Sequence, residues 1–111
     1  MKRQERTQSG IIGTKCQKIY MGYMWIISKR VIQKNTGNVS LFSFDADQKL
    51  SEHTAPFDAM VQVIEGEAEI VIENIPFHLV AGESIIMPAN HPHAVNAITK
   101  FKMLLIMIKE N

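Results

Sequence analysis

Apolar and polar residues alternate along most of this chain, and turn-forming residues interrupt the alternation at short intervals. After an N-terminal segment with no clear period, residues 23–33 are rich in β-branched and aromatic side chains, which is typical of a strand. Residues 35–38, Asn-Thr-Gly-Asn, predict a turn, and residues 39–44 predict the returning strand. The first half of the chain therefore indicates antiparallel strands joined by tight turns.

The second half repeats this rhythm. Further strands are predicted over residues 60–64, 68–73, 76–80, 84–88, 93–98 and 101–109. Glu65-Gly66, Asn74 and Ala81-Gly82 supply the turns between the earlier ones, and Pro88 ends the strand before it. No convincing amphipathic helix interrupts the series. Many short strands at close spacing predict an all-β protein, either a sandwich or a barrel.

The final segment, residues 101–109, is apolar enough to suit a buried helix as well as a strand. Alternation favours the strand, with Phe101 and Met103 on one face and Leu104 and Ile106 on the other. Because both faces are apolar, both need to be covered. One source of cover is a second copy of the chain, and this leads us to expect a homodimer.

Length and charge limit the class of protein. The chain has 111 residues, 46% of them hydrophobic, and suits one globular domain, with a tail over residues 1–20 and a β-barrel domain over 21–111. A net charge of +1 argues against nucleic acid as the main partner. The apolar runs are too short to span a bilayer, and no secretory signal is evident. The lone Cys16 is a poor candidate nucleophile, and a cytoplasmic protein is expected.

Residues 47–66 carry part of a known motif. The first motif of the cupin superfamily has the spacing G-x5-H-x-H-x3-E-x6-G. His53 and Gly66 match it, whereas Asp47 replaces the first glycine, and Ala55 and Ala59 replace the second histidine and the glutamate. The first motif is therefore degenerate.

Residues 82–96 resemble the second cupin motif, G-x5-P-x-G-x2-H-x3-N, more completely. Gly82, Pro88 and His93 match in register. Asn90 replaces the second glycine, which is tolerable because asparagine accepts positive φ, and Asn96 falls one place early. The chain thus resembles a small single-domain cupin. That resemblance implies a double-stranded β-helix, the jelly-roll barrel.

The resemblance also implies a metal site inside the barrel. In cupins the two motifs surround one metal ion, so His53 and His93 become the expected ligands of a divalent ion such as Fe, Mn, Ni, Zn or Cu. The two alanines of the first motif offer no donor atom. His91 is a candidate third ligand, and Asp58 a weaker one that would need a β-bulge to turn it inward. Alternatively, the two histidines are ordinary inward-facing polar residues, paired with each other or with water.

Strand parity predicts a pocket beside these histidines, since the odd-numbered residues from 53 to 63 should share the inner face. The expected lining residues are Ala55, Phe57, Ala59, Met87 and Met103. Apolar walls with few polar anchors are typical of small-molecule sites. Plain core packing is the alternative interpretation of the same residues.

Three functions remain open at this point. The first is a protein that binds an apolar or carboxylate small molecule in the barrel, together with a divalent metal on the two histidines. The second, by family analogy, is a metal-dependent enzyme of the dioxygenase, isomerase or decarboxylase type. The third is a metal-free structural barrel. The sequence favours the first slightly over the second.

Overall fold

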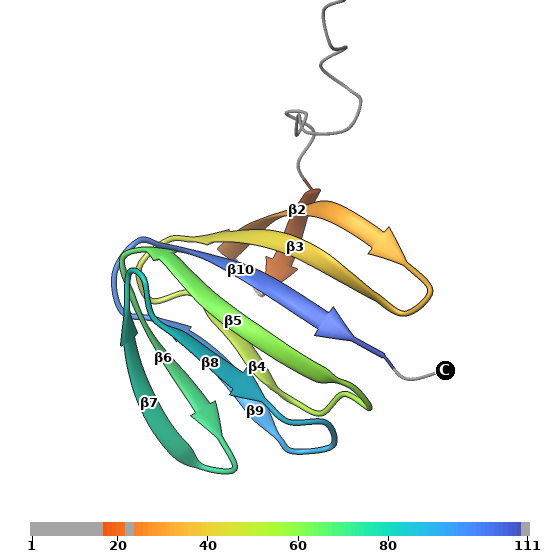
Figure 1. Cartoon of the computed structure of the whole chain (residues 1–111). Coiled ribbons are helices and arrows are strands. Elements are labelled where there is room, and N and C mark those ends of the chain that lie inside the picture. The colour runs from red at the N-terminus through yellow and green to blue at the C-terminus, as the bar shows by residue number, and fades with distance from the viewer. Residues whose placement is uncertain (1–16, 22–23, 110–111) are drawn as a thin grey trace, which may run out of the picture.

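The computed structural model describes residues 17–21 and 24–109, which form ten strands and no helix. The strands build two antiparallel sheets that face each other across a common core (Figure 1). The all-β jelly-roll barrel expected from the sequence is confirmed. Within the described residues, no helix is long and apolar enough to cross a membrane.

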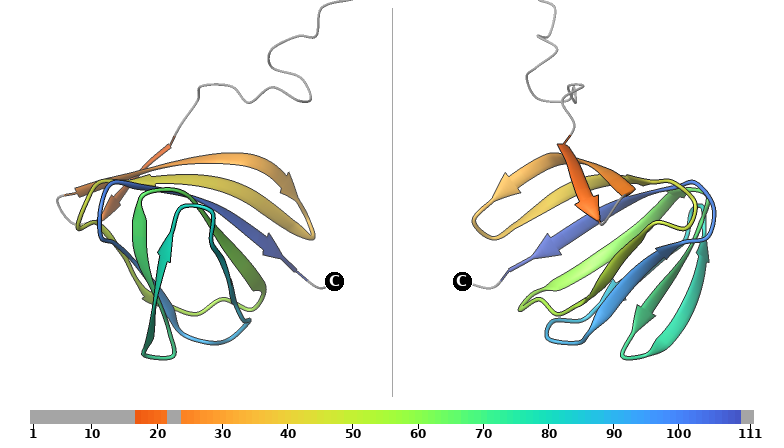
Figure 2. Two further views of the ribbon diagram at one scale, coloured as in Figure 1. Left: turned by 60° about the vertical axis from the view of Figure 1, so that its left-hand side comes forward. Right: turned by 180° about the vertical axis from the view of Figure 1, so that it is seen from behind.

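The larger sheet has the strand order β1-β2-β3-β10-β5-β8, and the smaller one has the order β4-β9-β6-β7. The strands of the larger sheet are β1 (Gln17–Met21), β2 (Met24–Lys34), β3 (Gly37–Phe44), β10 (Phe101–Ile108), β5 (Asp58–Glu65) and β8 (Ser84–Met87). Those of the smaller sheet are β4 (Lys49–His53), β9 (His93–Ala97), β6 (Glu67–Ile72) and β7 (Ile75–Val80). Strands that are distant in sequence, such as β3 and β10, therefore lie side by side (Figure 2).

The core between the two sheets consists of alternate residues from most strands. Its fully buried members include Val61 and Val63 of β5 and Ile70 of β6. Phe44 and Phe101 stack at one end, with ring centroids 4.9 Å apart. Each buried aliphatic side chain of this kind contributes about 1.5–3 kcal/mol to stability, so the facing sheets hold each other in place.

The predicted strands correspond closely to the observed β2, β3 and β5 to β10. The helix alternative for residues 101–109 is excluded, because β10 is a central strand paired on both sides, with β3 and β5. The larger sheet begins earlier than residue 21, since β1 starts at Gln17 and pairs with β2. Cys16 and the rest of the N-terminal segment lie outside the described residues.

The turns use left-handed backbone where the hairpins require it. Glu73 and Asn74, which join β6 to β7, have φ values of 48° and 65°. Positive φ at both central positions is the mark of a type I′ turn, whose twist matches that of the flanking strands. Gly66 and Gly82 also have positive φ, 79° and 92°.

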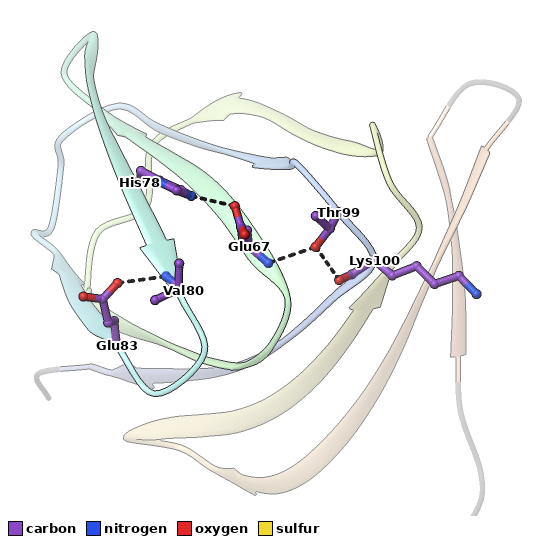
Figure 3. A network of polar contacts seen from close by, with 6 residues as sticks. All are labelled: Glu67, His78, Val80, Glu83, Thr99 and Lys100. Carbon is purple, nitrogen blue, oxygen red and sulfur yellow. Dashed lines mark hydrogen bonds and ion pairs between the residues drawn. The ribbon is translucent and has the colours of Figure 1, made fainter.

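Polar side chains fix the end of the barrel that carries the turns after β5, β7 and β9 (Figure 3). The amide of Glu67 donates to Thr99 Oγ1 at 3.0 Å, and this hydroxyl donates to the carbonyl of Lys100 at 2.8 Å. The Glu67 carboxylate also accepts from His78 Nε2 at 3.0 Å. His78 is exposed, as expected of an outer hairpin strand, and its role here is structural.

One face of β10 lies in the core, but its other face has no cover from the described residues. Cross-strand pairing places an apolar row over five strands of the larger sheet, which we call the outer row: Ile32, Val39, Ile106, Met60 and Ile86. Its end members, Ile32 and Ile86, are 50% and 55% exposed. An exposed row of this length is unusual for a monomer.

The two turn glycines differ in the space around them, which gives a matched test of the barrel's tolerance. A Cβ on Gly66 would collide with the carbonyl oxygen of Lys100 and lie 2.8 Å from Thr99 Oγ1, whereas a Cβ on Gly82 meets nothing. We expect Gly82→Ala to cost about 1–2 kcal/mol, the penalty for left-handed backbone. Gly66→Ala should cost at least about 2 kcal/mol more, because the clash is added. Urea unfolding measures both, and equal losses would contradict this account.

Candidate metal site at the barrel mouth

The barrel mouth is the end opposite the polar turns, formed by the end of β4, the start of β9 and the loops 54–57 and 88–92. β4 carries one extra residue there. Leu50 pairs with Val95, but His53 pairs with His93, so the register shifts by one between these two pairs. Without this bulge Glu52 would lie opposite His93. Bulges of this kind re-aim side chains, and this one places the two histidines directly across from each other.

The two imidazoles meet edge to face at the mouth. Their Nε2 atoms are 3.1 Å apart, and the ring centroids are 4.4 Å apart with an interplanar angle of 71°. Each ring is also fixed by the backbone of its own segment. His53 Nδ1 lies 2.7 Å from the carbonyl oxygen of Ser51, and His93 Nδ1 lies 3.1 Å from that of His91.

These contacts determine where the protons are. A carbonyl oxygen only accepts, so each Nδ1 must donate, and a neutral imidazole then has no proton left on Nε2. Two bare Nε2 atoms would face each other at 3.1 Å. Such a pair repels unless a cation lies between the two lone pairs, either a third proton or a metal ion.

Burial makes the third proton unfavourable. His93 is only 5% exposed, and this desolvation lowers its pKa. The neighbouring His53 lowers the pKa of His93 further, while the hydrogen bond to the His91 carbonyl opposes the shift. The neutral imidazole, which is the form that binds metals, is therefore favoured at His93.

The donor set fits a metal ion. Two imidazole nitrogens that share an ion, each about 2.0–2.1 Å from it, stand about 2.9–3.4 Å apart when they meet at about 90–110°. The observed Nε2 separation of 3.1 Å lies in that range. Ligating histidines also commonly donate their other N–H to a backbone carbonyl, as both do here.

The described residues supply no third protein ligand for the pair. Within residues 17–21 and 24–109, no group of three His, Cys, Asp or Glu side chains is placed to share an ion. The third candidate, His91, instead contacts the carboxylate of Glu73, with both side chains about half exposed. Asp58 stays outside as well, because its carboxylate accepts from the amide of Ala89 at 2.8 Å.

Of the five residues predicted to line a pocket, Ala59, Met87 and Met103 are packed in the core instead. Ala59 of β5 is buried and pairs with Met87 on one side and Met107 on the other, and the methionines occupy the space beside it. Met103 is also part of the packed core, 1% exposed. The inward parity predicted from 53 to 63 holds only within β5, because residues 54–57 belong to no strand.

The other two predicted lining residues lie in that loop. Ala55 is half-buried, and its carbonyl accepts from the amide of Asn90 at 2.7 Å, which ties the two mouth loops together. Phe57 lies beneath the ammonium group of Lys109, 5.5 Å from the ring centroid. It lines a rim pocket of about 520 Å³ together with Asp58 and Asn90.

A second pocket, which was not predicted, lies beside the cross-strand partner of His93. Its volume is about 430 Å³, and its lining is Ile72, Glu73, Ile75, Phe77, Ile85, Ile86 and Pro88. Ile72 is the cross-strand partner of His93, so the two side chains share the inner face. The sequence could have indicated this pocket through the alternation in β7. Alternation puts Ile75 and Phe77 on the same face as the buried Leu79.

Two residues that depart from the motif glycines adopt the backbone that glycine would supply. Asp47 has a φ of 69° and Asn90 a φ of 65°. The expectation that Asn90 accepts positive φ is confirmed, and Asp47 does the same. Asn96, one place early, points to the other face of β9 and donates to Glu69 at 3.0 Å.

Together, the fold and the mouth define a small β-barrel with two histidines from different strands that face each other at one end. A family model of the cupin domain matches residues 40–109, which is more than half of the chain. The chain therefore belongs to the cupin family, as its motifs suggested.

Solved structures with similar folds include other cupin proteins. A cupin 2 conserved barrel domain protein from Leptotrichia buccalis is 40% identical over 82% of this chain, with a TM-score of 0.74, although the match spans only 44% of that protein. A conserved protein of unknown function from Streptococcus pyogenes is 36% identical, over 78% of this chain and 75% of that one, with a TM-score of 0.75. A cupin superfamily protein from Desulfitobacterium hafniense is 28% identical, over 83% and 84%, with the same TM-score. A comparison with curated proteins finds no match.

The left-handed backbone at Asn90 supplies a direct test of the mouth loop. Asn90→Gly should leave the free energy of unfolding within about 1 kcal/mol of wild type, since glycine adopts the same φ freely. Asn90→Val should lose at least about 1–2 kcal/mol, because a β-branched residue is strained there. Both variants keep the amide that bonds Ala55, so chemical denaturation isolates the backbone effect. Equal stability of the two variants would refute it.

Proposed function

We propose that this cupin binds one divalent metal ion through His53 and His93 and a small organic molecule that completes the coordination. The observation that carries the proposal is the pair of Nε2 atoms 3.1 Å apart, each on a ring whose Nδ1 is engaged by a backbone carbonyl. A bound ion would supply Lewis acidity at the mouth. The two histidines hold and orient it, and the core beneath them keeps His93 out of water.

A metal-dependent enzyme is the alternative, and the donor set weighs against it. The superfamily's second histidine and glutamate are Ala55 and Ala59 here. No third His, Cys, Asp or Glu stands by the pair in the described part of the chain. An ion on two neutral imidazoles keeps its full charge and most of its coordination positions open. Such a site suits capture of an anionic or oxygen-donating ligand.

Metal content tests the proposal directly. Elemental analysis of untagged protein should find close to one divalent ion per chain. His53→Ala and His93→Ala should each lower that content at least about tenfold, since a single imidazole holds an ion weakly. His78→Ala is the matched control, because His78 is exposed and bonded to Glu67 far from the mouth. An empty wild-type protein whose melting temperature does not rise with added metal would refute the proposal.

We also propose that two copies of the chain pair through the outer row of the larger sheet. The row crosses five strands without a polar side chain, and its central member, Ile106, lies on the strand that is apolar on both faces. A twofold axis through this face would bring one outer row against the other.

Sedimentation tests the pairing. Wild type should sediment as a dimer, and Ile106→Lys should shift it to monomer, because a charge would then face the partner's apolar row. Ile98→Lys is the control, since Ile98 is 45% exposed but follows β9, away from this face. Thermal melting confirms that both variants fold. A wild type that stays monomeric at every concentration would contradict the proposal.

A further inference from the structure

The pocket beside His93 lies where the two sheets part. β7 is the last strand of the smaller sheet and β8 the last strand of the larger one, so neither has a further strand beside its outer edge in the described structure. The strands diverge from their shared turn toward the mouth (Figures 1 and 2). The pocket is lined by residues of both strands, Ile75 and Phe77 of β7 and Ile85 and Ile86 of β8.

The pocket runs from the core to the surface. Ile72 and Ile85 form its inner part, since both are partly buried and packed against the core. Ile75 and Phe77 form its outer part, exposed by 57% and 39%. Apolar side chains so exposed, in a pocket of about 430 Å³, are what a small apolar ligand would cover.

The lining offers few polar contacts. Six of the seven residues are apolar, and the exception, Glu73, is already engaged with His91. A polyhydroxylated molecule would lose hydrogen bonds to water there and regain almost none. An aliphatic or aryl body would lose nothing polar and would bury apolar area on both sides.

The pocket also lies next to the cross-strand partner of His93. Ile72 lies across from His93 on the same face, so a ligand that extends past Ile72 toward the mouth would reach the histidine pair. An ion on two neutral imidazoles keeps its full positive charge, and no protein carboxylate is placed with the pair in the described residues. A carboxylate head group would offset that charge and fill open coordination positions.

We infer that the pocket between β7 and β8 binds the apolar body of a carboxylate ligand, a medium-chain or aryl carboxylic acid, whose head group ligates the metal on His53 and His93. This inference rests on the proposed metal site. Phe77 is its specificity-determining residue, because its exposed ring forms the outer wall along which the apolar body would lie.

Calorimetric titration separates the parts of this inference. Octanoate, acetate and gluconate are titrated into metal-free protein and into protein loaded with Zn²⁺. On the loaded protein octanoate should bind at least about tenfold more tightly than acetate, and gluconate no more tightly than acetate. Phe77→Ala should weaken octanoate about tenfold while leaving acetate and Zn²⁺ unchanged. Ile98→Ala, a change at a similarly exposed apolar residue outside the pocket, should alter none of them.

The other possible results of the titration contradict either the pocket or the metal site. If Zn²⁺ binds but octanoate and acetate bind alike, or octanoate ignores Phe77→Ala, the pocket inference is overturned and the metal site stands. If Zn²⁺ does not bind and octanoate still binds through Phe77, the metal site and the head-group contact are overturned, whereas the apolar pocket stands. If octanoate binds no form of the protein, the inference fails whatever the metal result.

Discussion

One extra residue in β4 decides what the barrel mouth contains. The bulge between Leu50 and His53 shifts the pairing with β9 so that two imidazoles, rather than a glutamate and an imidazole, face each other. The backbone carbonyls of the same two segments then hold each Nδ1 proton away from the pair. The proximity and the tautomer of the pair follow from this single change of register, and the proposed metal site depends on it.

Sequence reasoning predicted the strands well because alternation and turn residues act locally. Motif spacing predicted that the two histidines lie together. The bulge that aligns them has no clear signal in the sequence. Strand parity does not show how the space beside an inward residue is filled. Ala59 faces inward as predicted, but Met87 and Met107 flank it and occupy that space. Residues 54–57 leave the sheet, and Phe57 of this loop lines the rim pocket. The second pocket lies beside Phe77, on a strand that the motifs do not cover.

The residues that differ from the cupin motifs fall into two kinds, those at positions where the backbone conformation matters and those at positions that would bind a metal. Asp47 and Asn90 replace glycines yet adopt the same left-handed backbone, with φ of 69° and 65°. These replacements preserve the turns of the barrel. Ala55 and Ala59 replace groups that carry donor atoms, and nothing in the described neighbourhood substitutes for them. The chain has thus kept the constraints of the fold while losing half of the expected ligand set.

The two histidines differ in the strands that carry them. His93 belongs to β9, an inner strand paired on both sides, and is 5% exposed, whereas His53 ends β4, the solvent-facing edge strand, and is exposed. A ligand at the end of an edge strand can swing away more readily than its buried partner. A metal ion bound here would therefore dissociate by first losing His53, and it would exchange with ions in solution faster than an ion enclosed by buried ligands. The occupant of such a site is set by the metals that surround the protein more than by the site's own selectivity.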